Sequence, residues 1–196
     1  MKKVHIVIIA VACIGLICGG FFIFSRGLDG LGEKNYEDLT DVEKIEVFDL
    51  EKDYPKTPRE VMKFYNQIVT CYYSGEVSDE DLEVLVDKML MLFDEELLLS
   101  HPRDEYLAAV KADVESYKQK KKTIVEASVC DSKEVDEVTD PDTGAEVSFV
   151  EVSYFIKTNG KFSRTHQEFM LRKDDDGQWK ILYYQLVGGE SSDDDE

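Results

Sequence analysis

The chain has 196 residues, of which 42 are acidic and 23 are basic, so its formal net charge is −19 at pH 7. Apolar residues make up 43% of the chain, which is enough for the core of one ordinary domain and argues against a disordered polypeptide. The acidic excess argues against nucleic acid as a partner, because binding to phosphate requires a concentrated surface of Lys and Arg.

A membrane segment is predicted at the N-terminus. Residues Val4 to Phe24 form a run of apolar and small residues that is interrupted only by His5. As a helix rising 1.5 Å per residue, this run spans about 31 Å, which matches the roughly 30 Å hydrocarbon core of a bilayer. Because Lys2 and Lys3 precede the run, the positive-inside rule predicts a single pass through the cell membrane, with a cytoplasmic N-terminus and an extracytoplasmic remainder.

Two alternatives exist for this segment, a cleaved signal peptide and a lipid anchor. Cleavage after the small residues Ala10 to Ala12 would leave a strongly apolar tail, Cys13 to Phe24, on the mature chain. Lipidation of Cys13 would start the mature lipoprotein with Ile-Gly-Leu-Ile, a poor leading sequence. An uncleaved signal anchor accounts for the whole run, and we therefore expect the lipid bilayer to be a partner of Val4–Phe24.

The chain is predicted to divide into four parts. Residues 1–25 form the transmembrane signal anchor, and residues 26–56 form an acidic stalk or linker. Residues 57–189 form an α+β exterior domain, and residues 190–196 form a disordered acidic tail. Within the linker, the short alternation Ile45-Glu46-Val47-Phe48 predicts either an edge strand or a segment docked on the domain.

Three helices are predicted at the start of the exterior domain. The first begins at Thr57, which together with Glu60 has the spacing of a capping box, and it ends at Gly75. The second begins at Ser78, which is followed by acidic residues suited to the positive end of a helix dipole. The third carries apolar residues at helical spacing over 106–117.

An antiparallel sheet is predicted for the rest of the domain, because the apolar period changes from 3.6 to 2 after Thr123. The strands are expected at 124–130, 147–158, 161–172 and 179–187. Asn159-Gly160, between the second and third strands, is a strong hairpin signal. Helices followed by an antiparallel meander indicate the α+β class.

The order of elements over residues 57–187 resembles the nuclear transport factor 2-like superfamily. This resemblance implies three helices packed on a curved antiparallel sheet, with a pocket inside a cone. Three segments, Asp53 to Val61, Leu92 to Leu97 and Leu171 to Ile181, are similar to an uncharacterised family of single-pass bacterial membrane proteins. Neither resemblance supplies a catalytic residue.

The sequence carries no recognisable pattern for metal or cofactor binding. Outside the membrane segment the only histidines are His101 and His166, and no His-Glu-x-x-His or Cys-x-x-Cys motif is present. The acidic run Asp174 to Gly177 is interpreted as a hairpin turn rather than a calcium loop, because Arg172 occupies the first ligand position of an EF-hand pattern. We expect no metal, no cofactor and no phosphate-binding loop.

Cys71 and Cys130 are the only cysteines outside the membrane segment. In an oxidising exterior they are able to form a disulfide, and they are equally able to be two small buried hydrophobic residues. We favour the second interpretation, because sequence spacing does not establish that two cysteines are close in space.

Candidate pocket residues follow from the alternation of side chains along the strands. If the faces that carry Glu151, His166 and Tyr183 converge inside the cone, these three residues are the candidates for ligand binding and acid–base chemistry. In this interpretation Tyr183 shares a face with Trp179 and Ile181. The stronger interpretation places His166 on an ordinary polar outer face, because Phe169 lies on the opposite face of the same strand and is a natural core residue.

The expected function is that of a membrane-anchored exterior domain without enzymatic activity, which binds a protein or another envelope component. One alternative is a scaffold subunit of a secretion or conjugation channel, since such subunits resemble this arrangement of one transmembrane helix and a cone-shaped exterior domain. The other alternative is a small-ligand carrier or an enzyme that uses the cone pocket. Fold alone does not decide among them.

Overall fold

The computed structural model describes residues 36–187 and 191–192. The predicted anchor at Val4–Phe24 lies outside these residues, as does most of the acidic tail. Among the residues described, there is no helix with the length and apolar character needed to span a bilayer. The chain divides into two compact units, residues 1–40 and 41–196. The described part of the first unit contains a short 3-10 helix, η1 (Tyr36–Asp38).

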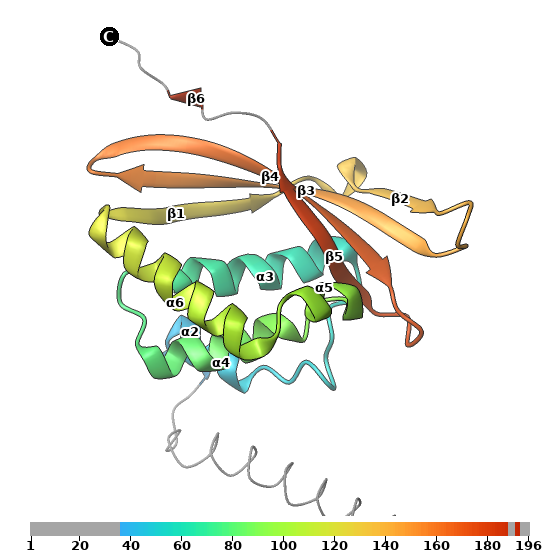
Figure 1. The fold of residues 1–196 in the computed structure, drawn as a ribbon, viewed down its shortest axis with the longest axis horizontal. Coiled ribbons are helices and arrows are strands. Elements are labelled where there is room, and N and C mark those ends of the chain that lie inside the picture. The colour runs from blue at the N-terminus through green and yellow to red at the C-terminus, as the bar shows by residue number, and fades with distance from the viewer. Residues whose placement is uncertain (1–35, 188–190, 193–196) are drawn as a thin grey trace, which may run out of the picture. The chain divides into compact units, whose positions relative to one another are not determined.

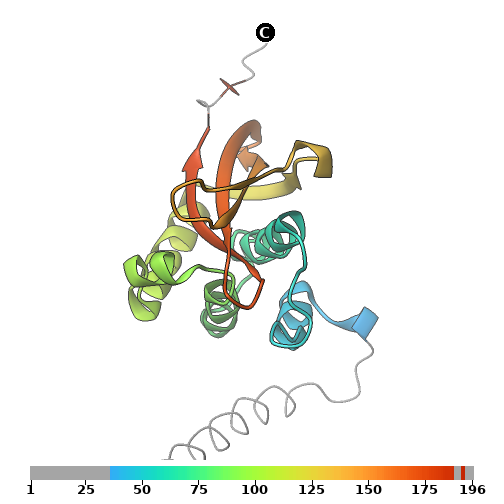
Figure 2. The ribbon, with the colours of Figure 1, turned by 90° about the vertical axis from the view of Figure 1, so that its right-hand side faces the viewer.

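The second unit is an α+β domain, as predicted, with its helices packed on one face of an antiparallel sheet (Figure 1). A view turned by 90° shows the same two layers (Figure 2). The elements, in chain order, are α2 (Asp41–Val47), α3 (Pro58–Tyr72), α4 (Asp79–Leu90), α5 (Glu95–Ser100), α6 (Arg103–Gln119), β1 (Lys122–Val129), η2 (Ser132–Glu134), β2 (Asp136–Thr139), β3 (Glu146–Thr158), β4 (Lys161–Lys173), β5 (Trp179–Leu186) and β6 (Ser191–Ser192).

The sheet has the antiparallel strand order β1-β3-β4-β5, with β2 also paired to β3 and β6 also paired to β4. The long β3–β4 hairpin is the centre of the sheet and turns at Asn159-Gly160, as predicted. Both turn residues have positive φ, 51° and 85°, a conformation that asparagine tolerates and glycine adopts without strain. Thr158 pairs with Lys161 directly across this turn, which fixes the register of the whole hairpin.

The predicted starts of the first two long helices are confirmed by their capping contacts. The Glu60 amide donates to Thr57 Oγ1 at 3.2 Å, and the Thr57 amide donates to Glu60 Oε2 at 3.2 Å. The same reciprocal arrangement joins Ser78 and Asp81 at the start of α4. Each pair satisfies backbone donors that the first turn of a helix leaves without partners.

Replacing Thr57 by alanine is expected to lower the free energy of unfolding by about 1 kcal/mol, because the cap on α3 is lost. Urea denaturation followed by circular dichroism measures this change. Thr70→Ala is the matched control in the same helix, since the Thr70 hydroxyl only donates to the Asn66 carbonyl one turn earlier. Equal losses in the two variants would show that the Thr57 cap has no special role.

Residues 41–56, which were expected within the acidic linker, belong to the second unit. Asp41–Val47 is a helix rather than an edge strand, and Ile45 and Leu50 are only 3% and 2% exposed. Phe48 packs on Phe64 of α3 with ring centroids 5.0 Å apart. The segment is therefore docked on the domain, which was the second of the two predicted possibilities. The alternation was too short to separate a strand from a helix.

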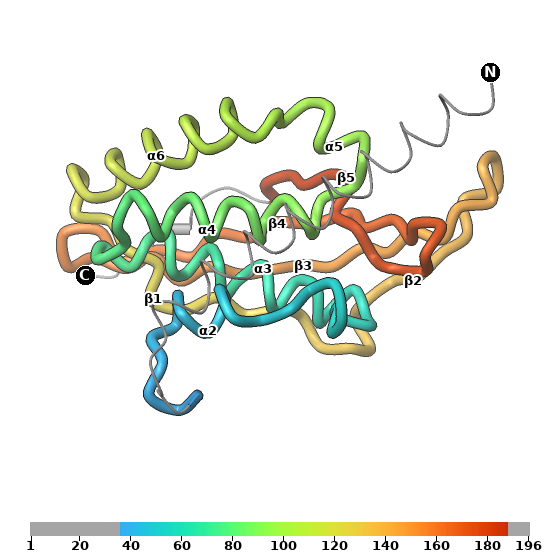
Figure 3. The backbone as a smooth tube through the Cα atoms, turned by 90° about the horizontal axis from the view of Figure 1, so that it is seen from below, coloured from blue at the N-terminus to red at the C-terminus, as the bar shows by residue number. Residues whose placement is uncertain are grey.

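The core lies between the sheet and the three long helices, which run side by side with α4 between α3 and α6 (Figure 3). From β3 the inward residues are even-numbered, with Val150 and Val152 fully buried, and from β4 they include Phe169 and Leu171. The outward residues on these two strands include Glu151 and His166. This alternation decides which strand residues are able to line an interior pocket.

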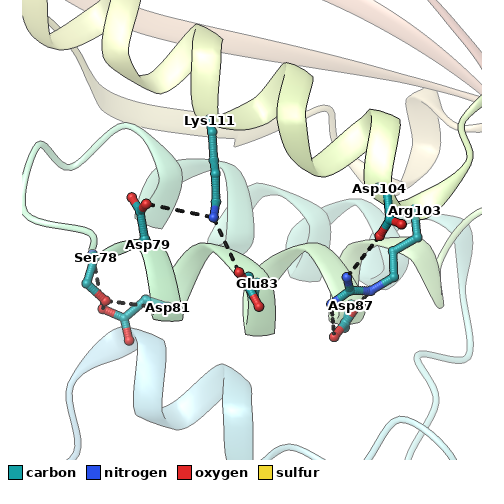
Figure 4. Close-up of polar contacts among 8 residues, drawn as sticks. All are labelled: Ser78, Asp79, Asp81, Glu83, Asp87, Arg103, Asp104 and Lys111. Carbon is teal, nitrogen blue, oxygen red and sulfur yellow. Dashed lines mark hydrogen bonds and ion pairs between the residues drawn. The ribbon is translucent and has the colours of Figure 1, made fainter.

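Ion pairs join the exposed sides of α4 and α6 (Figure 4). Arg103 Nε and Nη2 lie 2.5 Å and 2.8 Å from the two carboxylate oxygens of Asp87. Lys111 extends from α6 between Asp79 and Glu83, at 3.8 Å and 3.3 Å. Exposed pairs of this kind contribute about 1 kcal/mol or less to stability.

Candidate functional site

A pocket of about 610 Å³ lies between α6, α3 and the helix-facing side of the sheet. Seven of its lining residues are tyrosines, out of ten in the whole chain. We call it the tyrosine pocket, and its lining residues are Tyr65, Val69, Tyr72, Tyr73, Tyr106, Ala109, Val110, Asp113, Tyr117, Lys122, Ile124, Tyr154, Ile156, Thr165, Gln167, Tyr184 and Leu186.

Helical spacing on α3 and α6 places the tyrosines of these helices in the pocket wall. On α3, Tyr65 and Tyr72 are seven residues apart, so their side chains lie on one face of the helix. On α6, Tyr106, Val110 and Tyr117 recur at intervals of four and seven and form the facing wall. The sheet closes the pocket with inward residues of four strands, β1, β3, β4 and β5.

A chain of contacts runs across one side of the pocket. The Tyr73 hydroxyl donates to the Asp113 carboxylate. The Tyr73 ring stacks on the Tyr117 ring with centroids 4.0 Å apart, and the Lys122 ammonium lies 4.8 Å from the centroid of Tyr117. These contacts fix two of the seven tyrosine rings and engage Asp113, the one carboxylate among the described residues of the lining.

The deeper hydroxyl groups are buried, and two polar atoms near them lack partners. Tyr154 donates to Asn66 Oδ1 at 3.0 Å. The Tyr72 hydroxyl and Asn66 Nδ2 have no hydrogen-bond partner among the described residues, although Tyr72 is only 3% exposed. A buried hydroxyl without a partner is unusual in a folded protein.

Burial sets the protonation state of the pocket tyrosines. Burial raises the pKa of Tyr72, of Tyr106 and of Tyr154 far above the ordinary value. The pKa of Tyr73 is raised by burial and also by its hydrogen bond to Asp113. These hydroxyls therefore remain protonated at neutral pH, where they donate hydrogen bonds and do not act as bases.

Two of the sequence-predicted site residues, Glu151 and His166, meet on the outer face of the sheet. Glu151 Oε1 lies 2.9 Å from His166 Nδ1, and Ser153 Oγ lies 3.1 Å from the same nitrogen. A catalytic relay from serine to carboxylate requires the two ring nitrogens to contact different partners. Here both contacts use one nitrogen, and both ionisable side chains are about half exposed. The arrangement is a polar surface cluster rather than a nucleophilic triad.

The third predicted residue, Tyr183, also lies on the outer face, with 54% of its surface exposed. A β-bulge in β5 is the reason. Met170 pairs with Tyr183, but the next residue of β4, Leu171, pairs with Ile181, so β5 contains one extra residue. The predicted face shared by Trp179, Ile181 and Tyr183 is therefore wrong, and beyond the bulge Tyr184 points inward instead.

None of Glu151, His166 and Tyr183 lines the tyrosine pocket. Glu151 and His166 are titratable residues on the outward side of β3 and β4, whereas the tyrosines at helical spacing on α3 and α6 have the pattern of ordinary core residues. The concentration of tyrosine at helical spacing was the available signal. These tyrosines can be recognised as pocket residues only from the structure, which shows a cavity between α6, α3 and the sheet.

Cys71 and Cys130 are both free cysteines, and only Cys71 is buried as the favoured interpretation expected. Cys71 is buried on α3, and burial raises the pKa of its thiol to about 11. Cys130 is half-buried after β1. Within residues 36–187 and 191–192, no group of three or more His, Cys, Asp or Glu side chains is placed to bind a metal ion.

Comparison with known proteins gives a family without an assigned activity. A family model described as a domain of unknown function, DUF6715, matches residues 1–184. A search of curated proteins found no match to the chain.

Proposed function

The chain belongs to the DUF6715 family, and we propose that it is a non-enzymatic binding protein that takes a small, largely apolar ligand into the tyrosine pocket. The observation that carries this proposal is the pocket itself. Its volume of about 610 Å³ lies within the usual range for small-molecule sites, roughly 300–1,000 Å³. Its walls combine aromatic and aliphatic surface with a few polar groups, which is the usual composition of such a site.

Binding is favoured over catalysis by the chemistry of the lining. The tyrosine hydroxyls are neutral donors, for the reason given above, and the Asp113 carboxylate already accepts a hydrogen bond from Tyr73. A general base needs a free lone pair within reach of the substrate and a pKa near the working pH. The tyrosine pocket offers rings, donors and a lysine, which suit recognition better than proton abstraction.

Attachment to the cell membrane is part of the proposal. The apolar run Val4–Phe24 is long enough to cross a bilayer once, and the lysines before it favour a cytoplasmic N-terminus. The binding domain would then lie outside the cytoplasm, where it meets ligands from the medium or the envelope.

Filling the pocket mouth tests the binding function. Ala109 lines the pocket from α6, but it is exposed, so Ala109→Trp is expected to obstruct the pocket without unfolding the domain. The probe is 2-naphthylmethanol, a flat neutral molecule, titrated calorimetrically into the full-length chain in lipid nanodiscs. We expect at least about tenfold weaker binding to this variant than to the wild-type chain, because a blocked pocket excludes the naphthyl ring.

Ala108→Trp is the matched control. Ala108 is the preceding residue, is also exposed on α6 and does not line the pocket. This variant adds the same side chain to the same helix, and lipid partitioning of the probe is the same for both proteins. If the two variants bind 2-naphthylmethanol equally, or if the wild-type chain does not bind it, the tyrosine pocket is not the binding site.

A further inference from the structure

We propose that the ligand of the tyrosine pocket is an organic anion, a flat apolar body with a carboxylate that the Lys122 ammonium binds. This inference rests on the proposed binding function and names the class of ligand.

Lys122 is the positively charged residue in the described lining of the pocket. It is the first residue of β1, it is half-buried, and its ammonium lies over the ring of Tyr117. Within the described part of the chain it has no carboxylate partner, whereas Lys52, Lys111 and Lys173 each pair with an acid. Two other half-buried lysines without an acidic partner, Lys88 and Lys180, each donate to a backbone carbonyl, whereas Lys122 has no such acceptor among the described residues.

The other charged group of the lining, Asp113, is an exposed carboxylate that is hydrogen-bonded to Tyr73 and keeps its negative charge. Its carboxylate accepts the hydrogen bond of Tyr73, whose ring stacks on Tyr117. A ligand that pairs with Lys122 must bring an acceptor, and a carboxylate does so with a charge opposite to that of Lys122.

A cationic ligand fits this arrangement less well. Tyrosine rings attract cations, but the Lys122 ammonium already occupies the face of Tyr117 and would repel a second positive charge. The net charge of −19 does not reverse this preference. At physiological salt, exposed charges farther away than about 8 Å are largely screened, so the groups that line the pocket dominate.

The remaining surface of the pocket suits a flat apolar body. Val69, Val110 and Ile124 contribute aliphatic surface on three sides, and tyrosine rings contribute most of the rest. Aromatic rings stack in offset or edge-to-face geometry, as Tyr73 and Tyr117 already do, and a planar ligand adds to such a stack. The expected ligand class is therefore that of aromatic or similarly rigid carboxylates.

The test uses three naphthyl probes of one shape and different charge, 2-naphthoate, 2-naphthylmethanol and 2-naphthylmethylammonium. Each is titrated into the full-length chain in lipid nanodiscs at pH 7. We expect 2-naphthoate to bind about tenfold more tightly than the neutral alcohol, because its carboxylate gains a charge-assisted hydrogen bond to Lys122. We expect the ammonium probe to bind most weakly, because the Lys122 ammonium repels it.

Lys122→Met isolates the charge, because methionine keeps an apolar stem against Tyr117 and removes the ammonium. In this variant the preference for 2-naphthoate over 2-naphthylmethanol is expected to disappear, so that the ratio of the two affinities falls to about one. Lys120→Met is the control, since Lys120 is exposed at the end of α6 and does not line the pocket. It is expected to keep the preference for the anion, and urea denaturation checks that both variants are folded.

The outcomes separate this inference from the proposed function. If the neutral probe binds and Ala109→Trp blocks it, but 2-naphthoate is not preferred or Lys122→Met keeps the preference, the anion inference is overturned and the binding function stands. If Ala109→Trp affects none of the three probes, both fall. If Lys122→Met loses the preference for 2-naphthoate and Lys120→Met keeps it, the anion inference and the binding function are both supported.

Discussion

Replacing Arg172 by methionine is expected to lower the free energy of unfolding by about 3 kcal/mol or more, because it leaves a buried carboxylate without its partner. The carboxylate is that of Asp94, which is only 4% exposed. Arg172 Nη2 and Nε donate to its two oxygens at 2.6 Å and 3.0 Å. Asp94 also accepts from the Glu96 amide at 2.9 Å as the N-cap of α5, so the same residue fixes the α4–α5 junction against β4.

Urea denaturation of Arg172→Met and of the neighbouring Lys173→Met measures this effect. Lys173 pairs with Glu146 at 2.8 Å, but both side chains are partly exposed, and we expect a loss of about 1 kcal/mol or less. Adding Asp94→Asn to Arg172→Met should recover part of the loss, because the unpaired charge is removed. Equal losses in the two single variants, or no recovery in the double variant, would contradict this account.

Replacing Phe169 by alanine is expected to cost about 3–5 kcal/mol, the range for large cavities in a core that relaxes only partly. Phe169 is fully buried on β4. Its ring packs edge-on against Tyr65 at 5.0 Å between centroids and stacks on Tyr184 at 5.6 Å. Both tyrosines line the pocket, so the core behind the pocket depends on this ring.

Phe162→Ala is the control for Phe169→Ala, with the same change on the same strand. Phe162 is 48% exposed on the outer face and stacks on Phe155 at 5.1 Å. We expect a loss of about 1 kcal/mol, because only partly exposed apolar contacts are removed. Thermal and urea unfolding compare the two variants, and similar losses would show that Phe169 is not a central core residue.

The parts of the fold that could be predicted are those fixed by nearby residues. The capping box at Thr57, the helix start at Ser78 and the turn at Asn159-Gly160 depend on contacts within three residues, so the sequence pattern identifies them. The strands of the β3–β4 hairpin follow from their alternation and from this turn. The inward direction of Phe169 follows from the same alternation.

The parts that could not be predicted depend on distant contacts. The helix Asp41–Val47 is short, and its buried face is decided by packing on α3 and α4 rather than by its own pattern. The bulge in β5 reverses the alternation beyond Ile181, which moves Tyr183 out of the interior and Tyr184 in. The pairing of Arg172 with Asp94 joins residues 78 positions apart.

The tyrosine pocket could not be predicted from the sequence, because it also depends on contacts between distant residues. The sequence shows the tyrosines of α3 and α6 as two amphipathic faces, each of which an ordinary core would absorb. Only the placement of α6 against the sheet leaves space between them. The predicted residues Glu151 and His166 do lie in contact, but on the opposite face of the sheet.

The most direct test of ligand binding in the tyrosine pocket is a measurement of intermolecular nuclear Overhauser effects between 2-naphthoate and the full-length chain in lipid nanodiscs. We expect contacts from the naphthyl protons to the rings of Tyr117 and Tyr184 and to the methyl groups of Ile124. Contacts only to outer-face residues such as Phe162 and Tyr183, or to no protein protons at all, would contradict the account.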